Sequence, residues 1–182
     1  MAKPKPKSSI SDVINRRHRA LKIRTGYYAL LRRIIILGAI AWLLLTQVFL
    51  VARTAGNDMF PAIKDGDVVL VFRLHQDYLK DDVVAYSLDS TRHIGRIVAL
   101  ESDVVTMDDS GIISVNGTVQ SGEIIYPTYA KEGLIYPYRV PEGHIFVLGD
   151  HRAHAIDSRD FGPVPIEQVE GKIITLLRRR GL

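Results

Sequence analysis

The sequence predicts a mainly β domain, built of antiparallel strands, that follows one N-terminal transmembrane helix. Three observations support this fold class: an uncharged apolar run from Ile34 to Ala52, short runs of β-branched residues after it, and turn residues between those runs. The chain has 182 residues, of which 47% are hydrophobic. This length and composition suit one folded domain with an appendage.

The N-terminal segment, residues 1–33, is strongly basic. It holds ten of the 24 Lys and Arg residues but only one of the 20 acids, Asp12, so the rest of the chain is acidic overall. The basic excess stops where the apolar run begins. We therefore expect a basic cytoplasmic tail that contacts lipid headgroups, and no nucleic-acid partner.

Residues 34–52 are nineteen residues without a formal charge, bracketed by Arg33 and Arg53. At about 1.5 Å per residue, a helix of this length is close to the roughly 30 Å of bilayer hydrocarbon. Apolar side chains on every face argue against a buried core helix, and the length of the run argues against a cleaved signal peptide. The positive-inside rule then places residues 53–182 outside the cell membrane, as an extracytoplasmic domain.

Eight short runs rich in β-branched residues are predicted as strands of this domain. They are Val68–Phe72, Val83–Tyr86, Ile94–Leu100, Val104–Met107, Ile112–Val115, Val119, Ile145–Leu148 and Ile173–Leu177. Asn116-Gly117 predicts a two-residue hairpin, because a type I′ turn needs positive φ at both positions. No long amphipathic helix is evident, which favours a mainly β domain.

Cysteine is absent from the chain, which excludes a disulfide scaffold, a cysteine zinc site, an iron–sulfur cluster and a thiol nucleophile. His93, His151 and His154 are scattered, and we expect hydrogen-bonded or surface histidines instead of a metal site. His93 lies two residues from Gly95 and shares its face only if the strand is regular. No metal and no cofactor are expected.

Three stretches of the exterior segment carry a family resemblance. They are Ala55–Ile63, then Asp82–Tyr86 followed by His93–Val98, and finally Gly149–Gly162 with its Asp157-Ser158-Arg159 triplet. Their order and their position after an N-terminal anchor resemble bacterial type I signal peptidases, the membrane-bound serine endopeptidases of the S26 family that remove signal peptides. The resemblance extends from the anchor to Lys172 and implies a signal-peptidase-like antiparallel β domain.

The same resemblance implies that both catalytic side chains have been replaced. The family's nucleophilic serine falls on Asp58 and its general-base lysine falls on Gly95. Two supporting hydroxyl groups fall on Ala155 and Gly56. The departures are concentrated where the chemistry of the family takes place.

Physical chemistry also argues against proteolysis. The serine–lysine mechanism needs a hydroxyl beside a neutral amine, and Gly95 has no titratable group. Attack by the Asp58 carboxylate on an amide would give an anhydride that reverts more easily than it expels an amine, and its charge would oppose the developing oxyanion. A carboxylate pair of Asp58 and Asp157 is a weaker alternative, because the resemblance pairs Asp157 structurally with Arg96 and Arg159.

The substrate cleft implied by the resemblance has a floor and a wall. The floor comprises Asn57, Asp58, Met59 and Pro61, and the wall comprises Asp82, Val83, Val84 and Ala85. Such a cleft binds an extended peptide through backbone hydrogen bonds. The alternative for the wall is an ordinary core strand.

The pattern of a retained scaffold with an erased dyad resembles the signal-peptidase-like proteins of Gram-positive pilus gene clusters, the SipA type, including the Asp and Gly replacements. This resemblance implies a pseudoenzyme: a membrane-anchored, chaperone-like accessory protein of pilus assembly that binds a pilin precursor or the pilus sortase. The alternatives are an active signal peptidase with unconventional catalytic residues and a purely structural membrane β-protein.

Overall fold

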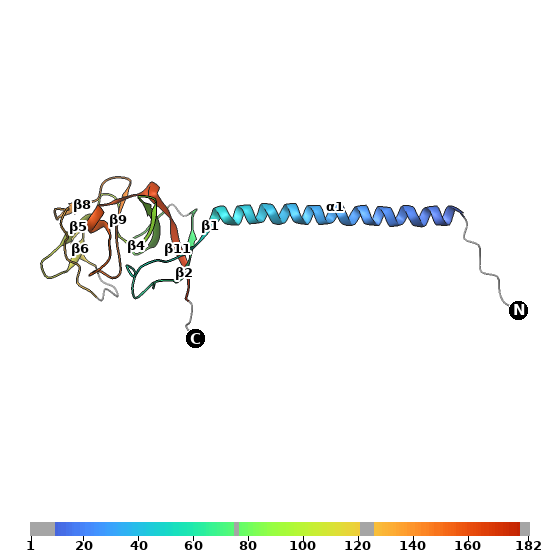
Figure 1. The fold of residues 1–182 in the computed structure, drawn as a ribbon. Coiled ribbons are helices and arrows are strands. Elements are labelled where there is room, and N and C mark those ends of the chain that lie inside the picture. The colour runs from blue at the N-terminus through green and yellow to red at the C-terminus, as the bar shows by residue number, and fades with distance from the viewer. Residues whose placement is uncertain (1–9, 75–76, 121–125, 179–182) are drawn as a thin grey trace. The chain divides into compact units, whose positions relative to one another are not determined.

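The chain forms two units, a long N-terminal helix and a β domain, in the computed structural model (Figure 1). The units are residues 1–46 and residues 47–182. The structure describes residues 10–74, 77–120 and 126–178, with side chains from Gly26 onward.

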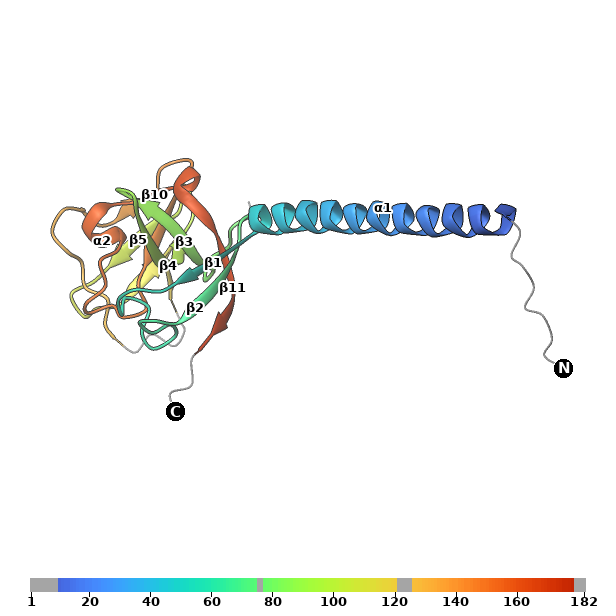
Figure 2. The same cartoon turned by 45° about the vertical axis from the view of Figure 1, so that its right-hand side comes forward.

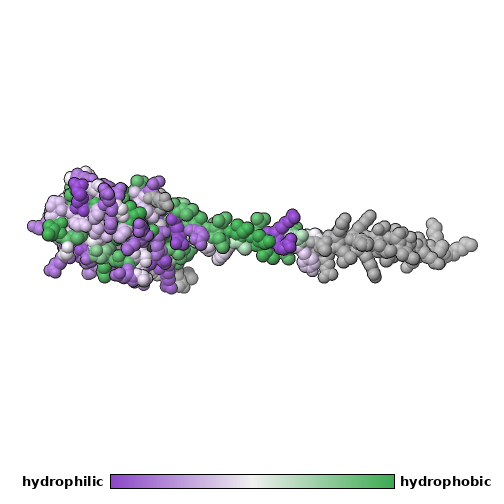
Figure 3. Space-filling model, turned by 90° about the horizontal axis from the view of Figure 1, so that it is seen from above, coloured by the Kyte–Doolittle hydropathy of each residue, from purple (hydrophilic) through white to green (hydrophobic). Residues whose placement is uncertain are grey.

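Helix α1 spans Ile10–Val48, and its segment Gly26–Val48 is long and apolar enough to cross a membrane. Large apolar side chains on this segment are exposed, among them Ile35 and Trp42, and Figure 3 shows apolar surface along it. A helix that is apolar on all sides is more stable in lipid than exposed to water. The predicted N-terminal apolar helix is confirmed.

The ends of this helix differ from the predicted boundaries. Helix α1 begins at Ile10, within the segment expected as a basic tail, and ends at Val48, four residues before Ala52. Residues Phe49–Arg53 form strand β1, which pairs antiparallel with β2 and stacks Phe49 against Phe72 at 5.6 Å between ring centroids. The apolar run therefore contains two elements, because its last residues find a partner strand.

The β domain consists of two antiparallel sheets (Figure 2). The larger sheet has the order β1-β2-β11-β3-β4-β9-β10, and the smaller has the order β7-β6-β5-β8. The strands after β1 are β2 (Val68–Phe72), β3 (Val83–Leu88), β4 (Thr91–Ala99), β5 (Val104–Met107), β6 (Ile113–Val115), β7 (Thr118–Val119), β8 (Tyr138–Arg139), β9 (His144–Leu148), β10 (Val164–Pro165) and β11 (Val169–Leu177). Helix α2 (Ser158–Phe161) and the 3₁₀ turn η1 (Ile166–Gln168) are short. The mainly antiparallel β fold class is confirmed.

The predicted hairpin turn joins β6 to β7 at Asn116-Gly117. Both residues have positive φ, 52° and 79°, as a type I′ turn requires. The Asn116 side chain also accepts a hydrogen bond from the Val104 N–H at 2.8 Å and donates one to Asp103 at 2.6 Å. The turn is therefore tied to the neighbouring strand β5.

Strand β3 has buried side chains on both faces, which places it inside the core. Ala85 belongs to a cluster with Met59, Ile63 and Val71. Val84 and Tyr86 point to the other side and belong to a second cluster with strands β4 and β9. The residues predicted to carry the chemistry lie around this strand.

Candidate functional site

Asp58 lies in the loop between β1 and β2, and its backbone is held from two sides. Its carbonyl accepts a hydrogen bond from the His151 N–H at 2.9 Å. A Cβ at Gly149 would lie 2.6 Å from the same carbonyl oxygen, so the loop after β9 packs directly on Asp58. Met59, which follows, is only 3% exposed and anchors the segment in the core.

The carboxylate of Asp58 is half-buried, and burial raises its pKa above the ordinary value. The negative charge of Asp157 raises this pKa further, whereas His93, His151 and Lys131 oppose the shift. None of the hydrogen bonds or ion pairs found among the described residues involves the Asp58 carboxylate. The cleft therefore presents a partly desolvated acid without a direct partner.

Gly95, in strand β4, is packed against aromatic and aliphatic side chains. A Cβ at this position would lie 3.3 Å from the Cε1 atom of Tyr86 and 3.3 Å from the Cβ of Val147. Tyr86 is 1% exposed, and burial raises the pKa of its hydroxyl, with Asp157 and Asp58 adding to the shift. A lysine at position 95 would require this buried ring to shift.

His93 lies on the same side of β4 as Gly95. The Tyr86 ring contacts the Gly95 position and also stacks on His93, with ring centroids 5.7 Å apart and planes at 22°. His151 and His154 form a separate ring pair at 4.7 Å. Over the described part of the chain, no group of three or more His, Cys, Asp or Glu side chains is arranged to hold a metal ion.

Asp157 is a structural anchor at the start of helix α2. Its two carboxylate oxygens accept hydrogen bonds from the Nε and Nη2 atoms of Arg159, each at 2.8 Å, and both side chains are 2% exposed. It also accepts from the Gly149 N–H at 3.1 Å and forms a capping box with Asp160. Four N–H groups thus converge on one buried carboxylate.

Arg96 makes a bidentate ion pair with Asp150, at 2.8 and 2.7 Å, whereas the resemblance implied Asp157 as its partner. The pairing register of β4 with β9 explains why Arg96 contacts Asp150. Arg96 pairs with Leu148 at the end of β9, so Asp150 follows two residues later beside the guanidinium. Asp157 lies further along the loop and is engaged by Arg159.

The wall expected from Asp82, Val83, Val84 and Ala85 requires a correction. Strand β3 pairs with β4 on one side and with β11 on the other, as in Val84↔Gly95 and Val84↔Lys172. A strand paired on both sides has no free backbone groups for a peptide. The alternative, an ordinary core strand, describes Val83, Val84 and Ala85, whereas Asp82 precedes β3 and forms an ion pair with Lys172.

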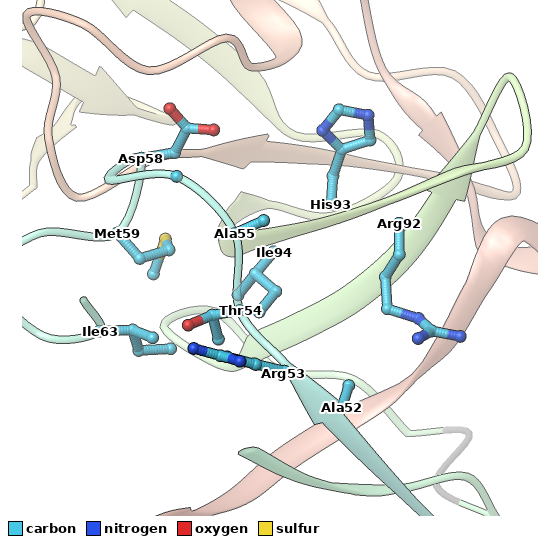
Figure 4. A pocket seen from close by; sticks show the side chains of 11 residues that line it. Ala52, Arg53, Thr54, Ala55, Asp58, Met59, Ile63, Arg92, His93 and Ile94 are labelled. Carbon is cyan, nitrogen blue, oxygen red and sulfur yellow. The ribbon is translucent and has the colours of Figure 1, made fainter. Parts of the chain in front are cut away.

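A pocket of about 110 Å³ lies instead between the segment after β1 and the first half of β4 (Figure 4). It is lined by Ala52, Arg53, Thr54, Ala55, Gly56, Asp58, Met59, Ile63, Arg92, His93 and Ile94. Asp58 and Met59 were predicted as cleft residues and do line it, whereas Asn57 and Pro61 do not. The β4 wall was missed, although the position of His93 beside Gly95 was a signal for it.

Both walls of this pocket have strand edges available for pairing. Strand β4 pairs with β9 only from Arg96 onward, which leaves Thr91–Ile94 bonded to β3 alone among the described strands. Strand β1 pairs with β2 and, in the same part of the chain, with no other strand. In antiparallel strands alternate residues direct their N–H and C=O outward, so these edges present backbone groups of the kind to which an added strand bonds.

The family model for signal peptidase, peptidase S26, matches residues 27–177. This match covers most of the chain and includes both walls of the pocket, Asp58 and the Asp157–Arg159 pair. The chain therefore belongs to the signal peptidase S26 family.

Several relatives are similar over about two thirds of the chain. The chain is 31% identical over 129 residues to mitochondrial inner membrane protease subunit 1 of Saccharomyces cerevisiae, covering 67% of this chain and 64% of the yeast protein. It is 32% identical over 135 residues to thylakoidal processing peptidase 1 of Arabidopsis thaliana, covering 65% and 38%. Signal peptidase I of Bacillus caldolyticus is 29% identical over 134 residues, covering 65% and 73%. The chain thus spans less than two thirds of the yeast and plant proteins.

A crystal structure of a signal peptidase I from Enterococcus faecalis is similar with a TM-score of 0.45 and 26% sequence identity. The similarity covers 55% of this chain and 98% of the enterococcal one.

Proposed function

We propose that this chain is a non-proteolytic member of its family, a membrane-anchored accessory protein of pilus assembly that binds a pilin precursor or the pilus sortase. The observation that carries the loss of proteolysis is the environment of the dyad positions. Asp58 offers a carboxylate where the family resemblance implies a hydroxyl. Gly95 offers no amine, and the Tyr86 ring lies 3.3 Å from where its Cβ would be.

Lys131 does not supply the missing base. The Lys131 ammonium, whose charge acts on Asp58, donates hydrogen bonds to Asp160 at 2.6 Å and to the Ala155 carbonyl at 2.7 Å. An ammonium group whose N–H groups point at a carboxylate and a carbonyl is not positioned as the base of a nucleophile. One of these contacts is made to the backbone carbonyl of Ala155, the residue on which the resemblance places a supporting serine.

The proposed protein still binds peptides although it does not cleave them. The pocket between β1 and β4 keeps two strand edges and an apolar floor, which are the elements of binding by strand addition. The Asp58 and Gly95 replacements, which resemble those of the pilus-associated proteins, support pilin or sortase as the client. The β domain acts outside the cell membrane in this proposal, with the basic residues 1–33 in the cytoplasm.

An active signal peptidase with unconventional catalytic residues is the second candidate. It is favoured by the relatives, whose names describe proteases and processing peptidases. A purely structural membrane β-protein is the third. Cleavage of a pilin precursor by the purified chain separates the second candidate from the other two.

Photocrosslinking in cells tests the binding role. A photoreactive amino acid at position 58 is expected to capture a pilin precursor or the sortase, because the pocket lining includes this residue. The same amino acid at Asp109, an exposed residue of the β5–β6 turn, is the matched control and should capture neither. If neither client is captured at position 58, or if both positions capture it equally, the accessory role is contradicted.

A further inference from the structure

An extended peptide in the pocket would present its side chains alternately to two different environments. Figure 4 shows Asp58 and His93 at one end of the pocket, and Ile63, Thr54 and Ala52 toward the other. This separation follows from the strands, because Ile94 packs on the core cluster beneath the pocket while His93 stacks on Tyr86. Neighbouring residues of one bound peptide therefore meet different chemistry.

The lower environment is apolar and small. Ala52, Met59 and Ile63 are each at most 7% exposed and line the pocket together with Ile94. A pocket of about 110 Å³ is smaller than the roughly 150 Å³ cavity that holds one benzene molecule. This end takes one small apolar side chain of the peptide.

The upper environment contains a carboxylate without a direct partner. Two cations of this region are engaged elsewhere: Arg92 pairs with Glu170 at 2.7 Å, and Lys131 pairs with Asp160 at 2.6 Å. His93 and His151 also act on the Asp58 carboxylate through their charge, but among the described residues neither makes a hydrogen bond or ion pair with it. Arg159 is committed to Asp157, whose negative charge also acts on Asp58. An ionised, half-buried carboxylate in this position is stabilised by a cation that the peptide itself brings.

We infer that the cleft selects an extended peptide in which a basic residue, Lys or Arg, follows or precedes a small apolar residue, with the basic side chain paired to Asp58. The inference rests on the proposed peptide-binding function and names the chemical class of its client. It gives Asp58 the role of a specificity-determining residue. The substitution that removes the nucleophile would then also create a selective contact for the bound chain.

The test measures the affinity of full-length protein, in a nonionic detergent at low salt and pH 8, for fluorescent peptides. In each peptide alanine alternates with one type of guest residue. The guest is lysine, arginine or norleucine. Norleucine has an unbranched side chain similar to that of lysine but carries no charge. Wild type should bind the lysine and arginine peptides about tenfold more tightly than the norleucine peptide, the factor that corresponds to 1.4 kcal/mol. Asp58→Asn should remove this preference, and Asp109→Asn should retain it.

The outcomes separate the inference from the function on which it rests. Equal affinity of wild type for the lysine and norleucine peptides overturns the inference and leaves peptide binding standing. A lysine preference that survives in Asp58→Asn also overturns it, because the charge would then be recognised elsewhere. No binding of any peptide contradicts the proposed function and the inference together. Asp58→Lys adds a positive check, since it should prefer a glutamate guest.

Discussion

Asp58 combines a rigid backbone with a side chain in an unfavourable electrostatic environment. Its carbonyl is fixed by the His151 N–H, while its carboxylate is partly desolvated and lies within range of the negative charge of Asp157. Such a carboxylate is costly to keep ionised unless a cation joins it. A residue of this kind is better suited to binding than to stabilising an oxyanion.

Asp58→Asn should stabilise the protein near neutral pH. A carboxyl whose folded pKa is raised binds its proton more tightly in the folded state, so its contribution to stability is greatest below the unfolded pKa and is lost as pH rises through the folded pKa. The neutral amide avoids that loss. The melting temperature of the variant should exceed that of wild type at pH 7.5, with a smaller difference at pH 4. An equal difference at both pH values would show that the charge of Asp58 is not the cause.

Asp157→Ala should destabilise the domain strongly. The substitution leaves the Arg159 guanidinium buried without its bidentate partner and removes the N-cap of helix α2. Breaking one side of a buried ion pair costs about 3–5 kcal/mol of unfolding free energy. Urea unfolding followed by circular dichroism measures this loss, with exposed Asp109→Ala as the control. An unfolding free energy within 1 kcal/mol of wild type, as a rough bound for surface changes, would contradict the structural role.

At the scale of elements, local sequence patterns predicted strands well where pairing was antiparallel and regular. The predicted runs Val68–Phe72 and Val104–Met107 coincide with β2 and β5, and the Asn116-Gly117 turn was identified by its φ requirement. Strand β1 was missed, because an apolar run is compatible with helix or strand until a partner strand is known. Strand β8 is only two residues long and carries no periodicity.

The site was harder to predict because it depends on which strand edges remain unpaired. The order of strands sets that property, and it places β3 between β4 and β11. Of the residues predicted for the cleft floor, Asp58 and Met59 line the pocket, whereas its second wall is formed by β4 and not by Asp82–Ala85. Side-chain type alone does not show that Tyr86 packs on the Gly95 position.

Gly149→Ala tests the contact between the loop after β9 and the segment that carries Asp58. The added Cβ would lie 2.2 Å from the Cβ of Ala155 and 2.6 Å from the Asp58 carbonyl oxygen, so one of these segments must move. We expect a lower melting temperature and weaker peptide binding. Gly38→Ala, in helix α1 with no neighbouring atom within 4 Å of the added Cβ, is the matched control. Unchanged peptide affinity in Gly149→Ala would contradict the role of this contact in holding Asp58.

At the scale of the whole molecule, the chain combines one apolar helix with one β domain. The helix carries exposed apolar side chains, whereas the β domain contains the pocket and the buried ion pair. The basic segment, residues 1–33, precedes the uncharged run from Ile34 to Ala52. This distribution of charge predicts the orientation of the chain in the membrane.

The orientation is testable because the chain contains no cysteine. Two single-cysteine variants, Ser9→Cys and Asp109→Cys, are treated in intact spheroplasts with a maleimide reagent that does not cross membranes. Asp109→Cys should be labelled at once, and Ser9→Cys only after lysis. The reverse pattern would contradict an extracytoplasmic β domain.

The proposed absence of proteolysis is tested most directly by incubating full-length protein in detergent with a signal-peptide substrate, beside an active signal peptidase as the positive control. Wild type should leave the substrate uncleaved, since the dyad positions provide neither a hydroxyl nor a free amine. Asp58→Ala is examined under the same conditions. Cleavage by wild type that disappears in Asp58→Ala would contradict this account and make Asp58 a catalytic residue.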